Sequence, residues 1–163
     1  MMLKQMMVLV LGWLMLGCAT IPKNIAPLQD TESFQYPFNK VWGATIETMS
    51  EMGFPISSSD KDSGLLVTQE HVFAGSSAPE GRENVKKPGE WTYLPGTGHL
   101  LLNGGWDKVS HRINLFVSPI DQNQTKVKVT TSFNSIYTNG TAEKYPSRGV
   151  LESEIFQKIK SKL

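Results

Sequence analysis

Three histidines, the side chains most often used for metal binding and for proton transfer near neutral pH, are spread along the 163-residue chain. His71, His99 and His111 lie in three separate segments, and no two of them have the spacing of metal ligands on one element. A metal site would therefore need three distant segments to meet, with no cysteine nearby to complete the ligand set. We expect these histidines to be exposed or at strand ends, and we predict no metal and no cofactor.

The other patterns that carry chemistry are also incomplete. The glycine-rich stretches at 96–98 and 103–105 do not follow a strand and open a helix, as a phosphate-binding loop does. No serine stands in a Gly-x-Ser-x-Gly sequence, and the two aspartates of 60–62 belong to a turn-forming segment. The sequence therefore predicts that the protein is not an enzyme.

The only cysteine, Cys18, follows an apolar segment near the N-terminus. Residues 1–5 carry one charge, Lys4, and Met6 to Leu16 are eleven residues without any charge. A bilayer-spanning helix needs about 20 apolar residues, so this segment is too short to be a conventional span. Its length and its basic start are typical of a secretion signal. With no second cysteine, Cys18 cannot form an intramolecular disulfide.

The four residues that end in this cysteine, "MLGC", resemble the lipobox of bacterial lipoproteins. Gly17 and Cys18 match that pattern, whereas Met15 and Leu16 depart from the usual choices. The resemblance implies cleavage before Cys18 and acylation of its thiol and its new amine. Two or three acyl chains anchor a protein stably in a bilayer, whereas a single chain does so only marginally.

The residues after Cys18 fit a lipoprotein with its domain outside the bilayer. Ala19 and Thr20 resemble the sorting signal for the outer membrane, and residues 18–30 are polar, proline-containing and without an apolar period. We therefore expect a signal peptide at 1–17, a flexible tether at 18–30, and a periplasm-facing protein held at the bacterial outer membrane by its lipid.

Charge and length limit the remaining possibilities. Cleavage before Cys18 would leave 146 residues, with 15 basic and 15 acidic side chains once Lys4 is removed. This balance argues against a nucleic-acid partner, which needs a basic footprint. Residues 31–163 suffice for one hydrophobic core, so we expect a single α+β domain there.

Apolar periodicity predicts the helices of this domain. Apolar residues three and four apart predict a helix that opens at Pro37 or Asn39 and ends at Gly53 in the left-handed conformation, with Phe54 folding back. Gly43 within it suggests close packing on a sheet. A second helix is expected over 147–163. The two apolar stripes are Phe38, Val41, Trp42, Ile46, Met49 and Met52, and then Leu151, Ile155, Ile159 and Leu163.

The alternation of apolar and polar residues predicts the strands of the domain. We expect a short strand within 32–37, a strand-turn-strand unit within 54–73, and an antiparallel hairpin of 110–118 with 126–133 that keeps one wet face. The expected order is strand, helix, strand, strand, long loop, strand, strand, helix.

The helix and turn residues resemble the domains of small lipoproteins related to BamC, the accessory lipoprotein of the machine that inserts β-barrels into the outer membrane. That resemblance implies a helix-grip fold, an antiparallel sheet wrapped around one long helix. The chain departs from BamC in having room for one such domain and in its shorter tether. The matching residues are Val41, Trp42, Gly53, Asp60, Gly64, Ser147, Gly149, Leu151 and Glu152.

The stretch 72–108 is expected to be a long loop insertion, with seven glycines and three prolines. It either covers one edge of the sheet or forms a flap that binds a partner or ligand. Its candidate binding residues are Trp91, Tyr93, Leu101 and Trp106. The expected function is a non-enzymatic interaction or accessory module in envelope or outer-membrane protein assembly, with an envelope protein as partner. The alternative is a carrier or sensor for an apolar molecule or lipid under the flap.

Overall fold

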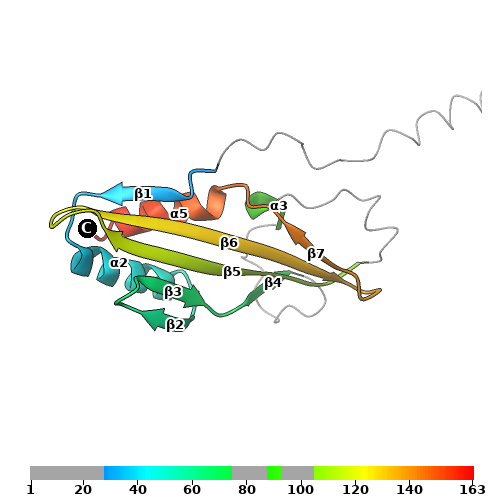
Figure 1. Cartoon of the computed structure of the whole chain (residues 1–163). Helices are drawn as coiled ribbons and strands as arrows, with labels where there is room; N and C mark the ends of the chain where they lie inside the picture. The colour runs from blue at the N-terminus through cyan, green and yellow to red at the C-terminus, as the bar shows by residue number, and fades with distance from the viewer. Residues whose placement is uncertain (1–27, 75–87, 93–104) are drawn as a thin grey trace, which may run out of the picture.

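The computed structural model describes residues 28–74, 88–92 and 105–163, which form an antiparallel sheet with helices packed on it (Figure 1). The expected α+β class with an antiparallel sheet is confirmed. The helices are α2 (Phe38–Glu51), α3 (Pro88–Trp91) and α5 (Val150–Lys160). The strands are β1 (Thr31–Phe34), β2 (Ile56–Asp60), β3 (Leu65–Thr68), β4 (His71–Ala74), β5 (Trp106–Pro119), β6 (Thr125–Tyr137) and β7 (Ala142–Tyr145).

Two long strands, β5 and β6, form the centre of the sheet and run its whole length (Figure 1). They pair with each other from Trp106 and Tyr137 to Pro119 and Thr125. Two shorter strands pair with each long strand at successive positions: β3 and β4 with β5, and β1 and β7 with β6. The remaining strand, β2, pairs with β3 at one edge.

The predicted hairpin is confirmed, and its strands are longer than expected. On β5 the alternate residues Ile113, Leu115 and Val117 are fully or almost fully buried, whereas Arg112 and Phe116, which alternate with them, are exposed. The connecting turn is closed by a hydrogen bond of 2.8 Å from the Ile120 amide to the Gln124 carbonyl. This alternation leaves the sheet with one buried face and one wet face.

Helix α2 ends as predicted. The Gly53 amide donates to the Ser50 carbonyl at 3.0 Å, and the Phe54 amide donates to the Met49 carbonyl at 2.9 Å. With Gly53 at a φ of 73°, this is a Schellman motif, and Phe54 and Met49 are both buried in the core. Gly43 contradicts its expected role: it is exposed and a Cβ there would meet nothing within 4 Å, so it does not mark close packing on the sheet.

Helix α5 buries the predicted stripe, with Leu151, Ile155 and Ile159 all fully buried. Glu152 in its first turn is also buried, and the Ser147 hydroxyl donates a hydrogen bond of 2.7 Å to the Glu152 carboxylate. The same hydroxyl oxygen accepts the Gly149 amide at 3.0 Å. A buried carboxylate needs such partners to offset its desolvation, so Ser147 and Glu152 belong together structurally.

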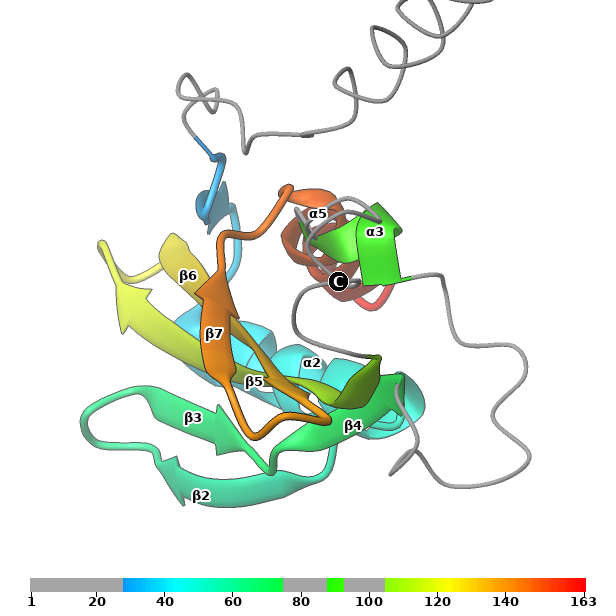
Figure 2. The same ribbon diagram turned by 90° about the vertical axis from the view of Figure 1, so that its right-hand side faces the viewer.

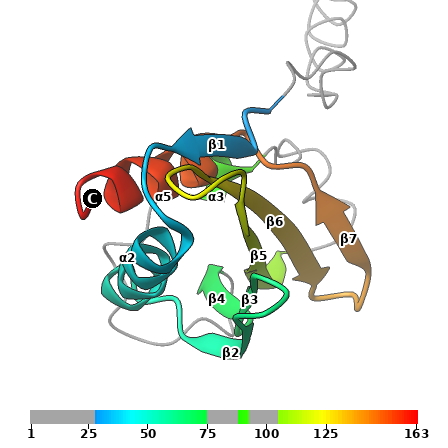
Figure 3. The same ribbon diagram turned by 60° about the vertical axis from the view of Figure 1, so that its left-hand side comes forward.

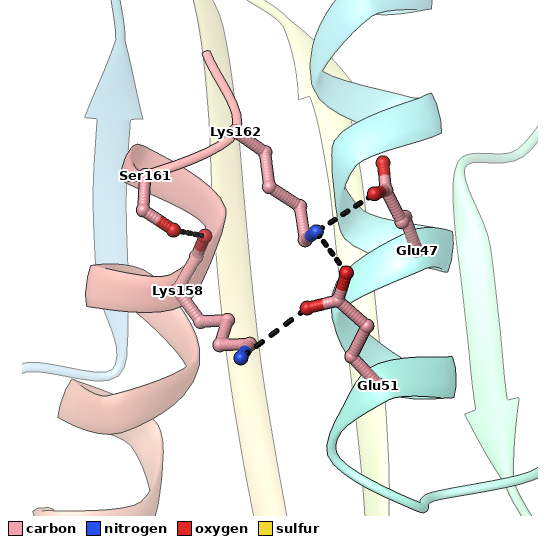
Figure 4. A network of polar contacts seen from close by, with 5 residues as sticks. All are labelled: Glu47, Glu51, Lys158, Ser161 and Lys162. Carbon is pink, nitrogen blue, oxygen red and sulfur yellow. Dashed lines mark hydrogen bonds and ion pairs between the residues drawn. The ribbon is translucent and has the colours of Figure 1, made fainter.

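Helices α2 and α5 pack on the same face of the sheet, as Figure 2 and Figure 3 both show. Ion pairs join their outer sides (Figure 4): Lys162 reaches Glu47 at 2.8 Å and Glu51 at 2.6 Å, and Lys158 reaches Glu51 at 3.2 Å. Most of these side chains are well exposed, so the pairs contribute little to stability.

The finer architecture departs from expectation. In the described residues the sheet covers two helices of 14 and 11 residues, and a single long helix wrapped by the sheet is not present. The order also differs, because β4, α3 and β7 were not predicted. Residues 72–74 and 106–108 at the two ends of the expected loop belong to β4 and β5. None of the helices in 28–74, 88–92 and 105–163 has the length and apolar character needed to cross a bilayer.

Candidate functional site

The second face of the sheet is not covered by any helix or strand of the described residues, and we call it the open face. From the Lys108–Ile136 pair onward, past the bulge at the start of β5, cross-strand register puts the even-numbered residues of both long strands on this face, for example Arg112 beside Ser132 and Asn114 beside Thr130. Their odd-numbered neighbours face the helices and make up the core. The open face is therefore mostly polar, with Phe116 and Ile136 as its exposed apolar residues, because the alternation that builds the core leaves the more polar half of each strand outside.

Near the middle of the open face lies a cavity of about 380 Å³ that is open to solvent, which we call the open-face concavity. Its walls come from β3, β5, β6, β7 and the connection before β4. All but one of its lining side chains are polar or charged. The lining residues are Val67, Glu70, Arg112, Asn114, Ser132, Asn134 and Lys144.

Sheet pairing positions the groups around the open-face concavity. Asn134 of β6 pairs with Ser110 of β5 on one side and with Lys144 of β7 on the other, so these three residues form one row across the sheet. Arg112 and Ser132 form the adjacent pair. Because each position is set by backbone pairing over long strands, the donors and acceptors stand on a rigid support rather than on loops.

Glu70 is the one acid of the open-face concavity, and its charge is already used within the protein. The Lys108 ammonium and the Ser110 hydroxyl each donate to it at 2.6 Å. These hydrogen bonds, first that of Lys108 and then that of Ser110, lower the pKa of Glu70 against a smaller opposing effect of burial, and Arg112 adds a weaker attraction. The negative charge of Glu70 is thus compensated within the protein. The basic groups of the concavity, Arg112 and Lys144, therefore set the charge that a ligand meets.

The predicted binding tryptophan, Trp91, lies in the hydrophobic core. Only 7% of its surface is exposed, and its ring lies edge-on to Phe54 at 6.5 Å and to His111 at 5.5 Å between centroids. The segment that carries it is held to the start of α5, since the Arg148 amide donates to the Trp91 carbonyl at 2.9 Å. Trp91 therefore packs over the covered face of the sheet, away from the open-face concavity.

The other predicted site residues fall into two groups. Trp106 is the first residue of β5, partly buried and packed against the core cluster. Tyr93, Leu101 and the expected lipidation residue Cys18 lie outside the described residues. The structure therefore brings Trp91 and Trp106 to the same core, and the expected flap between 72 and 108 is described only at 72–74, 88–92 and 105–108.

Two of the three histidines meet across the sheet, which sequence spacing does not reveal. His71 of β4 is the register partner of His111 of β5, and their rings are 5.2 Å apart. His71 begins its strand as expected, but the prediction is wrong for His111, which is fully buried in mid-strand. Burial, with a smaller contribution from the neighbouring His71, lowers the pKa of His111 to about 3, so the ring is neutral.

Aromatic rings surround His111, namely Phe54, Trp91 and Phe133, with centroids 5.1–5.7 Å away. Over 28–74, 88–92 and 105–163, no group of three or more histidine, cysteine or acidic side chains could hold a metal ion. His99 lies outside these residues. The histidine pair is therefore best understood as part of the packing beneath the Trp91 segment.

Comparisons with known proteins yield little. No protein-family model matches the chain, and no curated protein matches it either. One similar solved structure is a DUF4468 family protein from Bacteroides ovatus, with a TM-score of 0.35 and 12% sequence identity. The match covers 74% of this chain and 64% of that one, so this chain spans less than two thirds of that protein's length.

Proposed function

We propose that this protein is a lipid-anchored, periplasm-facing lipoprotein of the bacterial outer membrane that serves as a non-enzymatic interaction module in envelope assembly. The observation that carries the interaction role is the open face, where a polar cavity of about 380 Å³ stands on rigid strands while the core lies wholly on the other side. A carrier of apolar molecules would need an apolar lining, so the open-face concavity, with six of its seven side chains polar or charged, is not suited to that role. The alternative carrier site under 72–108 falls largely outside the described residues.

The anchor in this proposal rests on the sequence alone, through the uncharged segment Met6–Leu16 and Cys18. A Cys18→Ser variant should fold but no longer fractionate with membranes during detergent-free extraction. Continued membrane association of that variant would contradict the lipid anchor without bearing on the interaction role.

A helix-grip relationship to the BamC-related lipoproteins is part of the same proposal. Its support is that the resembling residues have defined structural tasks: Gly53 ends α2, Gly64 closes the turn against β5, and Ser147 with Glu152 begins α5. The second helix on the covered face and the extra strand β7 are the features in which this domain differs from one helix held by a sheet.

The interaction role is tested by capture from the organism's own envelope in mild detergent, using the acylated full chain as bait. A Ser132→Tyr variant fills the open-face concavity without changing charge, and Ser50→Tyr on the exposed side of α2 is the matched control. A stoichiometric protein that is captured by the wild type and the control, and lost with Ser132→Tyr, is the expected result. Recovery of a lipid and no protein would instead support the carrier.

A further inference from the structure

Basic side chains outnumber acidic ones on the open face. Five basic side chains point outward from β5, β6 and β7, and the acid of β7, Glu143, turns to the covered side, where Tyr145 and Tyr137 donate to it. Asp107 lies within the bulge at the start of β5. The five outward basic residues are Lys108, Arg112, Lys126, Lys128 and Lys144.

Two of these five charges are neutralised within the protein. Lys108 pairs with Glu70 at 2.6 Å, and Lys128 pairs with Asp30 at 3.3 Å. Arg112 and Lys144, the two basic residues that line the open-face concavity, have no acid within ion-pair distance among the described residues. The whole chain has a net charge of only +1, so this excess of positive charge is local to the open face.

The remaining groups of the open-face concavity suit a peptide. Arg112 offers a planar fork that matches a carboxylate, and Lys144 offers a second point charge. The amides of Asn114 and Asn134 can each donate to a backbone carbonyl and accept from a backbone N–H. Phe116, 45% exposed and two residues beyond Asn114 on the same face, adds an apolar contact.

We propose that the open-face concavity binds an acidic peptide segment of a protein partner, with Arg112 and Lys144 holding its carboxylates. This inference rests on the interaction role proposed above and names the chemistry of the partner. A flat anionic bilayer fits the arrangement less well, because the two cations line a recess that also contains Glu70. A nucleic acid would need more phosphate contacts than the two cations that line the concavity provide.

The test measures binding of fluorescein-labelled hexaglutamate to the acylated full chain in mild detergent by fluorescence polarisation, with hexaglutamine as the neutral control peptide. The Arg112→Ala/Lys144→Ala variant is compared with Lys61→Ala/Lys126→Ala, which removes the same charge from exposed lysines outside the concavity. Far-ultraviolet circular dichroism and thermal melts verify that both variants fold, as exposed substitutions should allow.

We expect binding of hexaglutamate that weakens with added salt, that drops by about tenfold or more in Arg112→Ala/Lys144→Ala, and that changes by less than about threefold in the control. Equal binding by both variants would overturn the inference, and so would absence of binding by the wild type. Variant-sensitive binding to phosphatidylglycerol vesicles without binding to hexaglutamate would overturn it in favour of a lipid surface.

The two proposals fail in different ways. If Ser132→Tyr abolishes capture of an envelope protein while hexaglutamate does not bind, the interaction role stands and the acidic-peptide inference falls. If hexaglutamate binds through Arg112 and Lys144 while the wild type captures no envelope protein, the concavity recognises acidic peptide and the proposed interaction role in the envelope falls.

Discussion

The two faces of the sheet have different roles, although residues of the same two strands, β5 and β6, form both. The covered face of β5 and β6 carries Val109, Ile113, Leu115, Val127 and Val129, each fully buried against α2 and α5. The open face of the same strands carries arginine, asparagine and serine around the open-face concavity, and β7 adds a lysine. Stability is therefore concentrated on one side, and the residues on the other side are free to serve binding.

This difference has a practical consequence for mutation. A change on the covered face alters packing and leaves a void or a buried polar group, which costs several kcal/mol. A change on the open face alters only groups already in contact with water, so its effect on stability stays small. The variants below compare positions on the two sides, in order of decreasing expected effect.

Truncation of a core aromatic side chain such as Trp42 should produce the largest loss of stability. This α2 residue is 7% exposed and its ring stacks on Phe38 at 5.8 Å. We expect Trp42→Ala to lower the free energy of unfolding by about 3–5 kcal/mol, measured by urea denaturation. Phe116→Ala on the open face, where 45% of the side chain is exposed, is the control and should cost far less. Equal losses would show that the two faces do not differ as described.

The buried His111 should make the covered face sensitive to acid. Its pKa of about 3 in the folded protein lies below the unfolded value of about 6.5, so the unfolded state binds the proton first as pH falls. This contribution is fully present above pH 6.5 and is lost between pH 6.5 and about 3. Between pH 7 and pH 4 the loss should be about 3 kcal/mol.

A His111→Phe variant removes the titrating ring and keeps an aromatic side chain among Phe54, Trp91 and Phe133. Urea denaturation of wild type and variant at both pH values should show a smaller decrease in the variant by about that amount. The carboxylates titrate alike in both proteins and cancel in the comparison. Parallel pH profiles would mean that His111 is accessible to protons in the folded state.

Gly64 joins the β2–β3 turn to the central strands. Its φ is 72°, its carbonyl accepts the Val117 amide at 2.8 Å, and a Cβ there would lie 1.9 Å from the Val117 carbonyl oxygen. Gly64→Ala should destabilise the protein by more than about 1–2 kcal/mol, because the left-handed conformation alone costs that much and the overlap adds to it. The matched control is Gly140→Ala, which has a φ of 82° but nothing within 4 Å. Equal losses in thermal melts would rule out the contact with Val117.

The spacing of apolar residues predicted the helices and strands that have a regular local pattern. The stripe of α2, the end of that helix at Gly53 and the alternation of β5 and β6 follow from single-residue spacing, and all are present. Strand β7 has no alternation of apolar residues, although the dipeptide Asn139–Gly140 before it is a strong hairpin signal that could have revealed it.

Contacts between segments that are far apart in the chain could not be predicted from the sequence. His71 and His111 are 40 residues apart and become neighbours only through the register of β4 and β5. Both helices were predicted, but their packing on one face of the sheet was not, since an apolar stripe shows that a helix is buried without showing which face receives it. The open-face concavity draws on four strands and one connection, and the predicted wet face of the hairpin was its only local sign.

A substitution on the outer side of α2 is expected to increase stability, by a smaller amount than the losses above. Gly43 is helical and exposed, with space for a Cβ. Because alanine favours a helix interior over glycine by roughly 1 kcal/mol, Gly43→Ala should stabilise the protein by about 0.5–1 kcal/mol in urea denaturation. A loss of stability would mean that the helix needs the freedom of glycine at this position.

The smallest effect on stability is expected at Ser132, beside its buried neighbour Phe133 on β6. Their side chains leave the strand on opposite faces: Ser132 lines the open-face concavity, and Phe133 is 1% exposed. Ser132→Ala should change the free energy of unfolding by less than about 0.5 kcal/mol, whereas Phe133→Ala should cost about 3–5 kcal/mol. Urea denaturation measures both on one strand. If Ser132→Ala also destabilised the protein by several kcal/mol, the open face would be part of the folding core, and its polar residues would owe their places to stability rather than to binding.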